Sequence, residues 1–83
     1  MIESLPDFLV ALVTCENQTQ ADKIARSLLD KHLAACVNIL PGAKSVYWWQ
    51  GKIEEAAECL LIIKTRETRL GDITAEVKRL HSY

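Results

Sequence analysis

Hydrophobic residues follow two periodicities along the chain, and these predict strands and helices in turn. Residues 8–14 (FLVALVT) form a short continuous apolar run, which is typical of a buried strand. Between Ala21 and Leu33 apolar residues recur at helical spacing with charged residues opposite, which predicts an amphipathic helix of about 15 residues. Thr19, with Asp22 three positions later, has the spacing of a helix N-cap.

The middle of the chain has the composition of a long β-hairpin. Strand-forming residues occupy 35–40, stop at Pro41 and Gly42, and resume at 45–49, so the Pro-Gly pair predicts a bulge or bend. The sequence Gln50-Gly-Lys predicts a tight turn, which makes residues 44–65 a hairpin. A second helix follows, capped by Thr68, with Glu76 outside its apolar stripe. The apolar positions of this helix are Leu70, Ile73, Val77 and Leu80.

The resulting order, β-α-β-β-α, is that of the ferredoxin-like split β-α-β fold without its fourth strand. We therefore expect residues 1–83 to form a single α+β domain that is truncated at the C-terminus relative to that fold. Right-handed crossovers place both helices on one face of the sheet. Residues 8–13 and 60–63 are nevertheless apolar at successive positions, so both faces of the sheet must be buried. The face without helices is expected to pack on another chain.

Three consecutive aromatic residues, Tyr47, Trp48 and Trp49, support self-association. Adjacent strand residues face opposite sides, so rings project from both faces. A strand from Cys36 to Trp49 spans about 46 Å at ~3.3 Å per residue, which would carry the hairpin beyond its own subunit. We predict that the three aromatic residues anchor an oligomer interface. The alternative is that they are core residues beneath a strand bent at Pro41 and Gly42.

The composition excludes several classes of protein. The 83 residues are 49% hydrophobic and carry a net charge of −1, which argues against disorder and against an electrostatic nucleic-acid binder. No apolar run approaches the ~20 residues of a membrane-spanning helix, and the first residues lack the basic segment of a secretion signal, so a cytoplasmic protein is expected. The strands lack the stacking aromatics of RNA-recognition modules, and a Gly-rich phosphate loop is missing.

Few residues are candidates for chemistry. His81 lies in a loop after the second helix and is the better candidate ligand, whereas His32 is interpreted as structural or merely exposed. Cys15 ends the first strand, where a partly exposed thiol could bind a soft metal such as copper. No second ligand lies close in sequence, which favours a buried bystander instead. Cys36 and Cys59 lie within strands and are interpreted as small core residues. The spacing of the cysteines signals neither a disulfide framework nor a zinc site.

Three segments resemble a known family: LAACVNILPG at 33–42, SxYWWxGK at 45–52 and ExLLIIKT at 58–65. Together with the rest of the chain from Phe8 to Tyr83, they are similar to the CutA divalent-cation tolerance proteins. The resemblance implies a ferredoxin-like homotrimer, interlocked through its hairpins and exposed sheet faces and similar to the PII regulatory trimers. It implies no enzyme activity and no organic cofactor, but a response to copper or another divalent cation.

The resemblance also implies metal ligands. His81 and Tyr83 match a family His-Pro-Tyr stretch in which the histidine is implicated in copper binding, with Ser82 in place of the proline. The accompanying thiol would fall at Val13, and Cys15 lies two residues further along on the same strand face. We therefore predict His81 and Cys15 as metal ligands. Because the family continues past this tyrosine, the chain is expected to be truncated.

The sequence thus predicts a cytoplasmic, non-enzymatic homotrimer of the CutA type that takes part in metal-ion tolerance. One alternative is a PII-like trimer that responds to a small ligand and binds metals incidentally. Another is an enzyme whose catalytic groups meet across the subunit interface.

Overall fold

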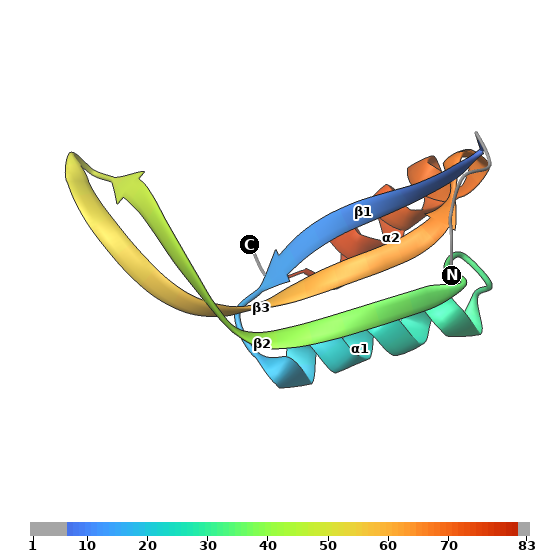
Figure 1. Ribbon diagram of the computed structural model, residues 1–83, viewed down its shortest axis with the longest axis horizontal. Helices are drawn as coiled ribbons and strands as arrows, with labels where there is room; N and C mark the ends of the chain where they lie inside the picture. The colour runs from blue at the N-terminus through green and yellow to red at the C-terminus, as the bar shows by residue number, and fades with distance from the viewer. Residues whose placement is uncertain (1–6, 82–83) are drawn as a thin grey trace.

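The predicted β-α-β-β-α order is confirmed (Figure 1). The computed structural model describes residues 7–81. Its strands are β1 (Phe8–Cys15), β2 (Cys36–Trp49) and β3 (Lys52–Arg66), and its helices are α1 (Gln18–Asp30) and α2 (Leu70–Leu80), the latter preceded by the 3-10 turn η1 (Glu67–Arg69). The α+β class is therefore confirmed as well.

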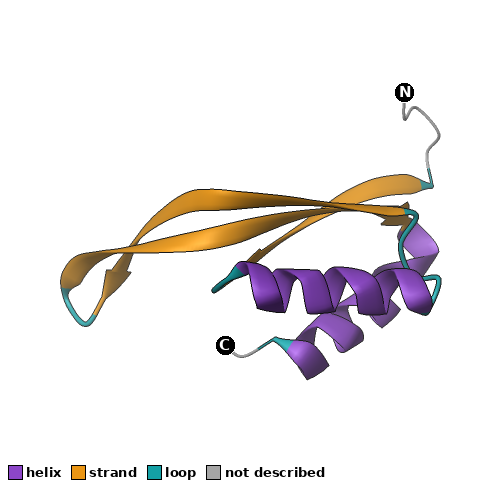
Figure 2. Cartoon of the chain, turned by 90° about the horizontal axis from the view of Figure 1, so that it is seen from below, coloured by secondary structure: helices purple, strands orange, loops and turns teal. Residues whose placement is uncertain are grey.

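The strands form one antiparallel sheet in the order β1-β3-β2, so within residues 7–81 β1 lies at one edge. Both helices lie on the same face of this sheet, as predicted (Figure 2). Because side chains alternate between the two faces, the register of the strands defines a second face that carries no helix. We call it the open face. Its main residues are Val10, Leu12 and Thr14 of β1, Leu40, Tyr47 and Trp49 of β2, and Glu58, Leu60 and Ile62 of β3.

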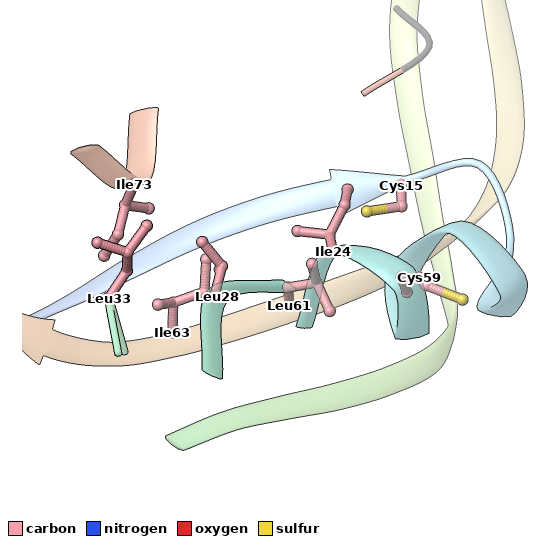
Figure 3. Close-up of a cluster of buried hydrophobic side chains, with 9 residues drawn as sticks. Cys15, Ile24, Leu28, Leu33, Cys59, Leu61, Ile63 and Ile73 are labelled. Carbon is pink, nitrogen blue, oxygen red and sulfur yellow. The ribbon is translucent and has the colours of Figure 1, made fainter. Parts of the chain in front are cut away.

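The hydrophobic core lies between the sheet and the helices (Figure 3). Four of its side chains are fully buried isoleucines and leucines, two from α1 and two from β3, and Cys15 closes the core at the end of β1. The α1 members are Ile24 and Leu28, and the β3 members are Leu61 and Ile63. Thr65 extends the core with a polar contact, because its hydroxyl donates a 2.7 Å hydrogen bond to the carbonyl oxygen of Leu33.

Helix α1 begins earlier than predicted. Its N-cap is Asn17, whose Oδ1 accepts a hydrogen bond of 2.8 Å from the backbone N–H of Gln20. Thr19 therefore lies inside the first turn, and its prediction as the cap is wrong. Asparagine and threonine are both suitable N-caps, and here the asparagine, which comes earlier in the chain, accepts the bond from Gln20.

The hairpin of β2 and β3 contains two irregularities that the sequence predicted. A bulge lies between Leu40 and Ala43, where Gly42 has a φ of +79° that a residue without a Cβ adopts at little cost. At the tip, Gln50 and Gly51 both have positive φ, 51° and 78°, as a two-residue hairpin turn of the favoured twist requires. The hairpin projects well past the helices (Figures 1 and 2), which gives the chain an extent of 41 × 25 × 21 Å.

Helix α2 differs from the prediction at its start and on its inner side. Thr68 lies within η1, and neither η1 nor α2 has a side-chain N-cap, so the predicted cap is wrong. The turn η1 makes the transition from β3 in its place. Glu76, expected outside the apolar stripe, is only 7% exposed because it faces α1 and is surrounded by donors from both helices.

Candidate subunit interface and metal site

The open face is apolar and uncovered in the single chain. Val10 is 54% exposed and Leu12 is 65% exposed on β1, and Leu40 on β2 is 43% exposed. Leu60 and Ile62 of β3, which lie between them in the register, are partly buried by these neighbours. The sheet thus presents a continuous aliphatic surface of the kind that soluble monomers rarely expose.

The aromatic residues at the hairpin tip continue this exposure. Tyr47 and Trp49 extend the open face at 44% and 59% exposure, whereas Trp48 faces the opposite side and is 72% exposed. Val46 and Ile53 lie beside Trp48 and are also more than half exposed. The alternative interpretation of the three rings as core residues is therefore wrong for this chain, because the hairpin extends beyond the helices that would have to cover them.

A hollow of about 650 Å³ lies where the open face meets the hairpin. It combines two aromatic rings, Tyr47 and Trp49, with two carboxylates, Glu16 and Glu58. The sequence pattern gave no sign of this hollow. Glu16 directly follows β1 and Glu58 lies within β3, and the β1–β3 register, which pairs Cys15 with Cys59, brings the two carboxylates to the same hollow.

His81 lies directly after α2 and is held against the edge of the sheet. Its backbone N–H donates a 2.7 Å hydrogen bond to the carbonyl of Val77, and its side-chain Nε2 lies 2.6 Å from the carbonyl oxygen of Thr14. Since a carbonyl only accepts, Nε2 carries the proton in this contact. A metal ion bound at Nε2 would have to displace this hydrogen bond. The structure thus places the predicted ligand at β1, beside Leu12 and Val13 in a surface hollow of about 380 Å³.

Cys15 is buried. Its side chain is 0% exposed, so the interpretation as a buried bystander is confirmed and the alternative of a partly exposed thiol is wrong: α1 begins three residues later and folds back over the end of β1. Burial raises the pKa of the Cys15 thiol, and the neighbouring Cys59 and Glu58 raise it further. His81 contacts the carbonyl of the residue that precedes Cys15, but the thiol itself points into the core (Figure 3).

The remaining candidates have structural environments. Cys59 is buried in the core as predicted, whereas Cys36 is half-buried on the open face. His32 is exposed just beyond α1 and adopts a left-handed backbone conformation with a φ of 56°. Tyr83 and Ser82, which the family resemblance singled out, lie outside the described residues.

A charged cluster joins the two helices at Glu76. Its carboxylate accepts hydrogen bonds from Arg79 at 2.7 and 3.0 Å, from the hydroxyl of Ser27, and from Lys31 at 2.9 Å. These donors, Arg79 foremost, hold the pKa of Glu76 well below its usual range. The cluster is the main polar contact between α1 and α2. Only the i, i+3 spacing of Glu76 and Arg79 hinted at it in the sequence.

Comparison with known proteins shows which family the chain belongs to. The family model described as CutA1 divalent ion tolerance protein matches residues 9–83. The chain belongs to this family. The crystal structure of CutA1 from Oryza sativa has a TM-score of 0.91 to this chain at 49% sequence identity, covering 93% of this chain and 71% of the rice chain.

Curated CutA proteins agree with the family model. Protein CutA 1, chloroplastic, of Oryza sativa subsp. japonica is 51% identical over 75 residues, which are 90% of this chain and 42% of the relative. The divalent-cation tolerance protein CutA of Archaeoglobus fulgidus is 49% identical over 71 residues, which are 86% of this chain and 69% of the relative. The chain therefore spans less than half of the rice relative.

The CutA1 family model is named for divalent ion tolerance. Among residues 7–81, no three His, Cys, Asp or Glu side chains gather into a group that could bind an ion. Val13, where the family thiol would fall, packs against the hydrophobic core. A site based on His81 therefore needs ligands beyond those that this part of the chain brings together. In the same part of the chain, no helix is long and apolar enough to cross a membrane.

Proposed function

We propose that the chain acts in divalent-cation tolerance as a cytoplasmic homotrimer, with a binding role and no catalytic one. The observation that carries the proposal is the uncovered apolar surface of the open face and hairpin. A second copy of the same surface is a suitable cover, because it is equally apolar and has the same strand geometry. The proposed number of subunits, three, is taken from the resemblance to the CutA family.

The hairpin gives the proposed assembly its reach. Trp48 and Trp49 face opposite sides of a ribbon that extends past its own helices, so each ring is available to a neighbouring subunit. Large aromatic side chains that become fully desolvated contribute most of the binding energy in many interfaces. Two such residues at the end of a projecting arm favour interlocked subunits over a flat pairing of sheets.

We propose His81 as a ligand for copper or another divalent cation at the boundary between subunits. Imidazole suits these ions, and the ring lies at the edge strand β1, where a neighbouring chain can approach. Metal binding at Nε2 would exchange the hydrogen bond to the Thr14 carbonyl for a coordinate bond. The remaining ligands would come from outside residues 7–81 of the same chain or from the neighbouring subunit.

Native mass spectrometry and sedimentation velocity test the assembly. The wild-type chain is expected at three times its monomer mass, and the double variant Trp48→Ala/Trp49→Ala is expected to shift toward monomer. Leu70→Ala is the matched control, since Leu70 is also a large exposed apolar residue, at 42%, but begins α2 on the helix side. A monomeric wild type, or a double variant that stays trimeric, contradicts the proposal.

Titration of the same samples with copper(II) and zinc(II) tests the metal ligand. Wild type is expected to bind one ion per subunit specifically, and His81→Ala is expected to lose that binding. His32→Ala is the control, because His32 is exposed and lies just after the C-terminal end of α1, whereas His81 lies near the start of that helix. Equal binding by wild type and His81→Ala would remove His81 from the metal site.

The hollow that contains Glu16, Glu58, Tyr47 and Trp49 favours a second candidate, a PII-like trimer that responds to a small ligand. Carboxylates beside aromatic rings suit a cationic organic molecule. Native mass spectrometry of protein purified under mild conditions is expected to show an added small mass in that case. Loss of the added mass in Glu16→Gln would support this candidate over direct metal sensing.

A further inference from the structure

Two of the three cysteines lie directly opposite each other in the sheet. Cys15 is the last residue of β1, and the register pairs it with Cys59 of β3. Both are free thiols on the helix-covered face, 0% and 4% exposed respectively. Residues opposite each other in an antiparallel pair have Cβ atoms roughly 4.5–5.5 Å apart. The backbone therefore holds two sulfur-bearing side chains within reach of a single ion.

The third cysteine cannot join this pair. Cys36 is opposite Lys64, which lies further along β3 than Cys59, and it faces the open face of the sheet. The arrangement thus gives two ligands and no third thiol. Two thiolates in line are the preferred coordination of soft monovalent cations with a filled d shell, whereas harder divalent ions require more ligands than the pair provides.

We propose that Cys15 and Cys59 form a two-coordinate dithiolate site for a soft monovalent cation, for which silver(I) is the probe. On binding, each thiol gives its proton to solvent and each sulfur forms one bond to the ion, so no electron is transferred. Figure 3 shows the two sulfur atoms pointing in opposite directions. Closure on an ion therefore requires one side chain to rotate about its Cα–Cβ bond.

Binding of an ion has to overcome the cost of deprotonating a buried thiol. Burial raises the pKa of Cys15, and Cys59 and Glu58 raise it further. One monovalent cation between two thiolates removes most of their mutual repulsion. Because two protons leave when the ion binds, its apparent affinity rises with pH. The site is independent of the proposed divalent-cation function, since it uses neither His81 nor a subunit contact.

Silver(I) titration of reduced protein in the Cys36→Ala background tests the proposal, because only the pair then remains. Binding is followed by the ultraviolet absorbance of the silver–thiolate bond and by native mass spectrometry. One ion per chain is expected. Removing either member, as Cys15→Ala or Cys59→Val in the same background, is expected to weaken binding on the order of 100-fold, because one of two joined ligands is lost. Circular dichroism verifies that each variant is folded.

Two results would overturn the site. Two silver ions per chain in the Cys36→Ala protein would mean that the thiols bind separately. An affinity unchanged by Cys59→Val would mean that Cys15 alone holds the ion. Either result leaves the trimer and the role of His81 untouched, so failure of this inference is distinguishable from failure of the proposed function.

Discussion

Replacement of Leu12 by alanine tests whether the open face is a subunit interface. Leu12 is the most exposed aliphatic residue of β1, at 65%, so most of its burial would occur on association rather than on folding. Leu→Ala removes roughly three methylene equivalents at ~0.8 kcal/mol each, or about 2.4 kcal/mol for full burial. Since about two thirds of the side chain is still exposed in the single chain, about that share of the free energy, ~1.5 kcal/mol per chain, is lost from association.

The effect is multiplied in a symmetric assembly. Three chains lose ~4.5 kcal/mol together, which lowers the trimer association constant by about 1,000-fold at 1.4 kcal/mol per factor of ten. The concentration of half-dissociation varies with the inverse square root of that constant for a monomer–trimer equilibrium. It is therefore expected to rise by about 30-fold.

Sedimentation velocity over a dilution series measures this concentration directly. Leu29→Ala is the matched control, because Leu29 is also an exposed leucine, at 42%, but lies on α1 on the opposite side of the sheet. Leu29→Ala is expected to leave the midpoint where it is in wild type. A midpoint in Leu12→Ala that matches wild type would refute the assignment of the open face to an interface.

Two further predictions concern stability. Asn17→Ala removes the hydrogen bond to the N–H of Gln20 and is expected to lower the free energy of unfolding by about 1 kcal/mol in urea denaturation, whereas Thr19→Ala has little effect; the reverse order would contradict the assigned cap. The lowered pKa of Glu76 contributes stability that is present above ~4.3, the ordinary value of the unfolded chain, and is lost as pH falls below it. Wild type is therefore expected to lose stability more steeply below that pH than Glu76→Gln, and parallel urea midpoints would contradict the ionised cluster.

The elements of this fold were predictable because local and global signals agree in them. Helical spacing from Ala21 onward, the Pro41-Gly42 interruption and the Gln50-Gly51 turn each specify a backbone conformation with short-range chemistry. The structure then uses each of them in the predicted place. The open face was also predictable, since two-sided apolar strands combined with helices on one side leave no other arrangement.

The features that sequence reasoning missed depend on contacts between distant segments. Glu76 looked like a surface residue, and its burial follows from donors in the last turn and at the C-cap of α1, which are 49 and 45 residues away. For Cys15 the sequence left both a partly exposed and a buried thiol open, and the path of the chain into α1 decides for burial. The cap of α1 was misplaced because Asn17 and Thr19 are both suitable acceptors, whereas the predicted cap at Thr68 fails because the turn η1 leads into α2 without a side-chain cap.

Strand β1 carries both inferences, and its alternation keeps them apart. Val10 and Leu12 project from the open face, whereas Val13 and Cys15 project toward the helices. An ion held by Cys15 and Cys59 is therefore separated from the proposed subunit interface by the thickness of the sheet. A shift of one residue in the β1–β3 register would exchange the two sets, exposing the thiol and burying Leu12. The apolar residues on both faces thus fix different properties: the helix side sets the register, and the register determines which surface is left for a partner.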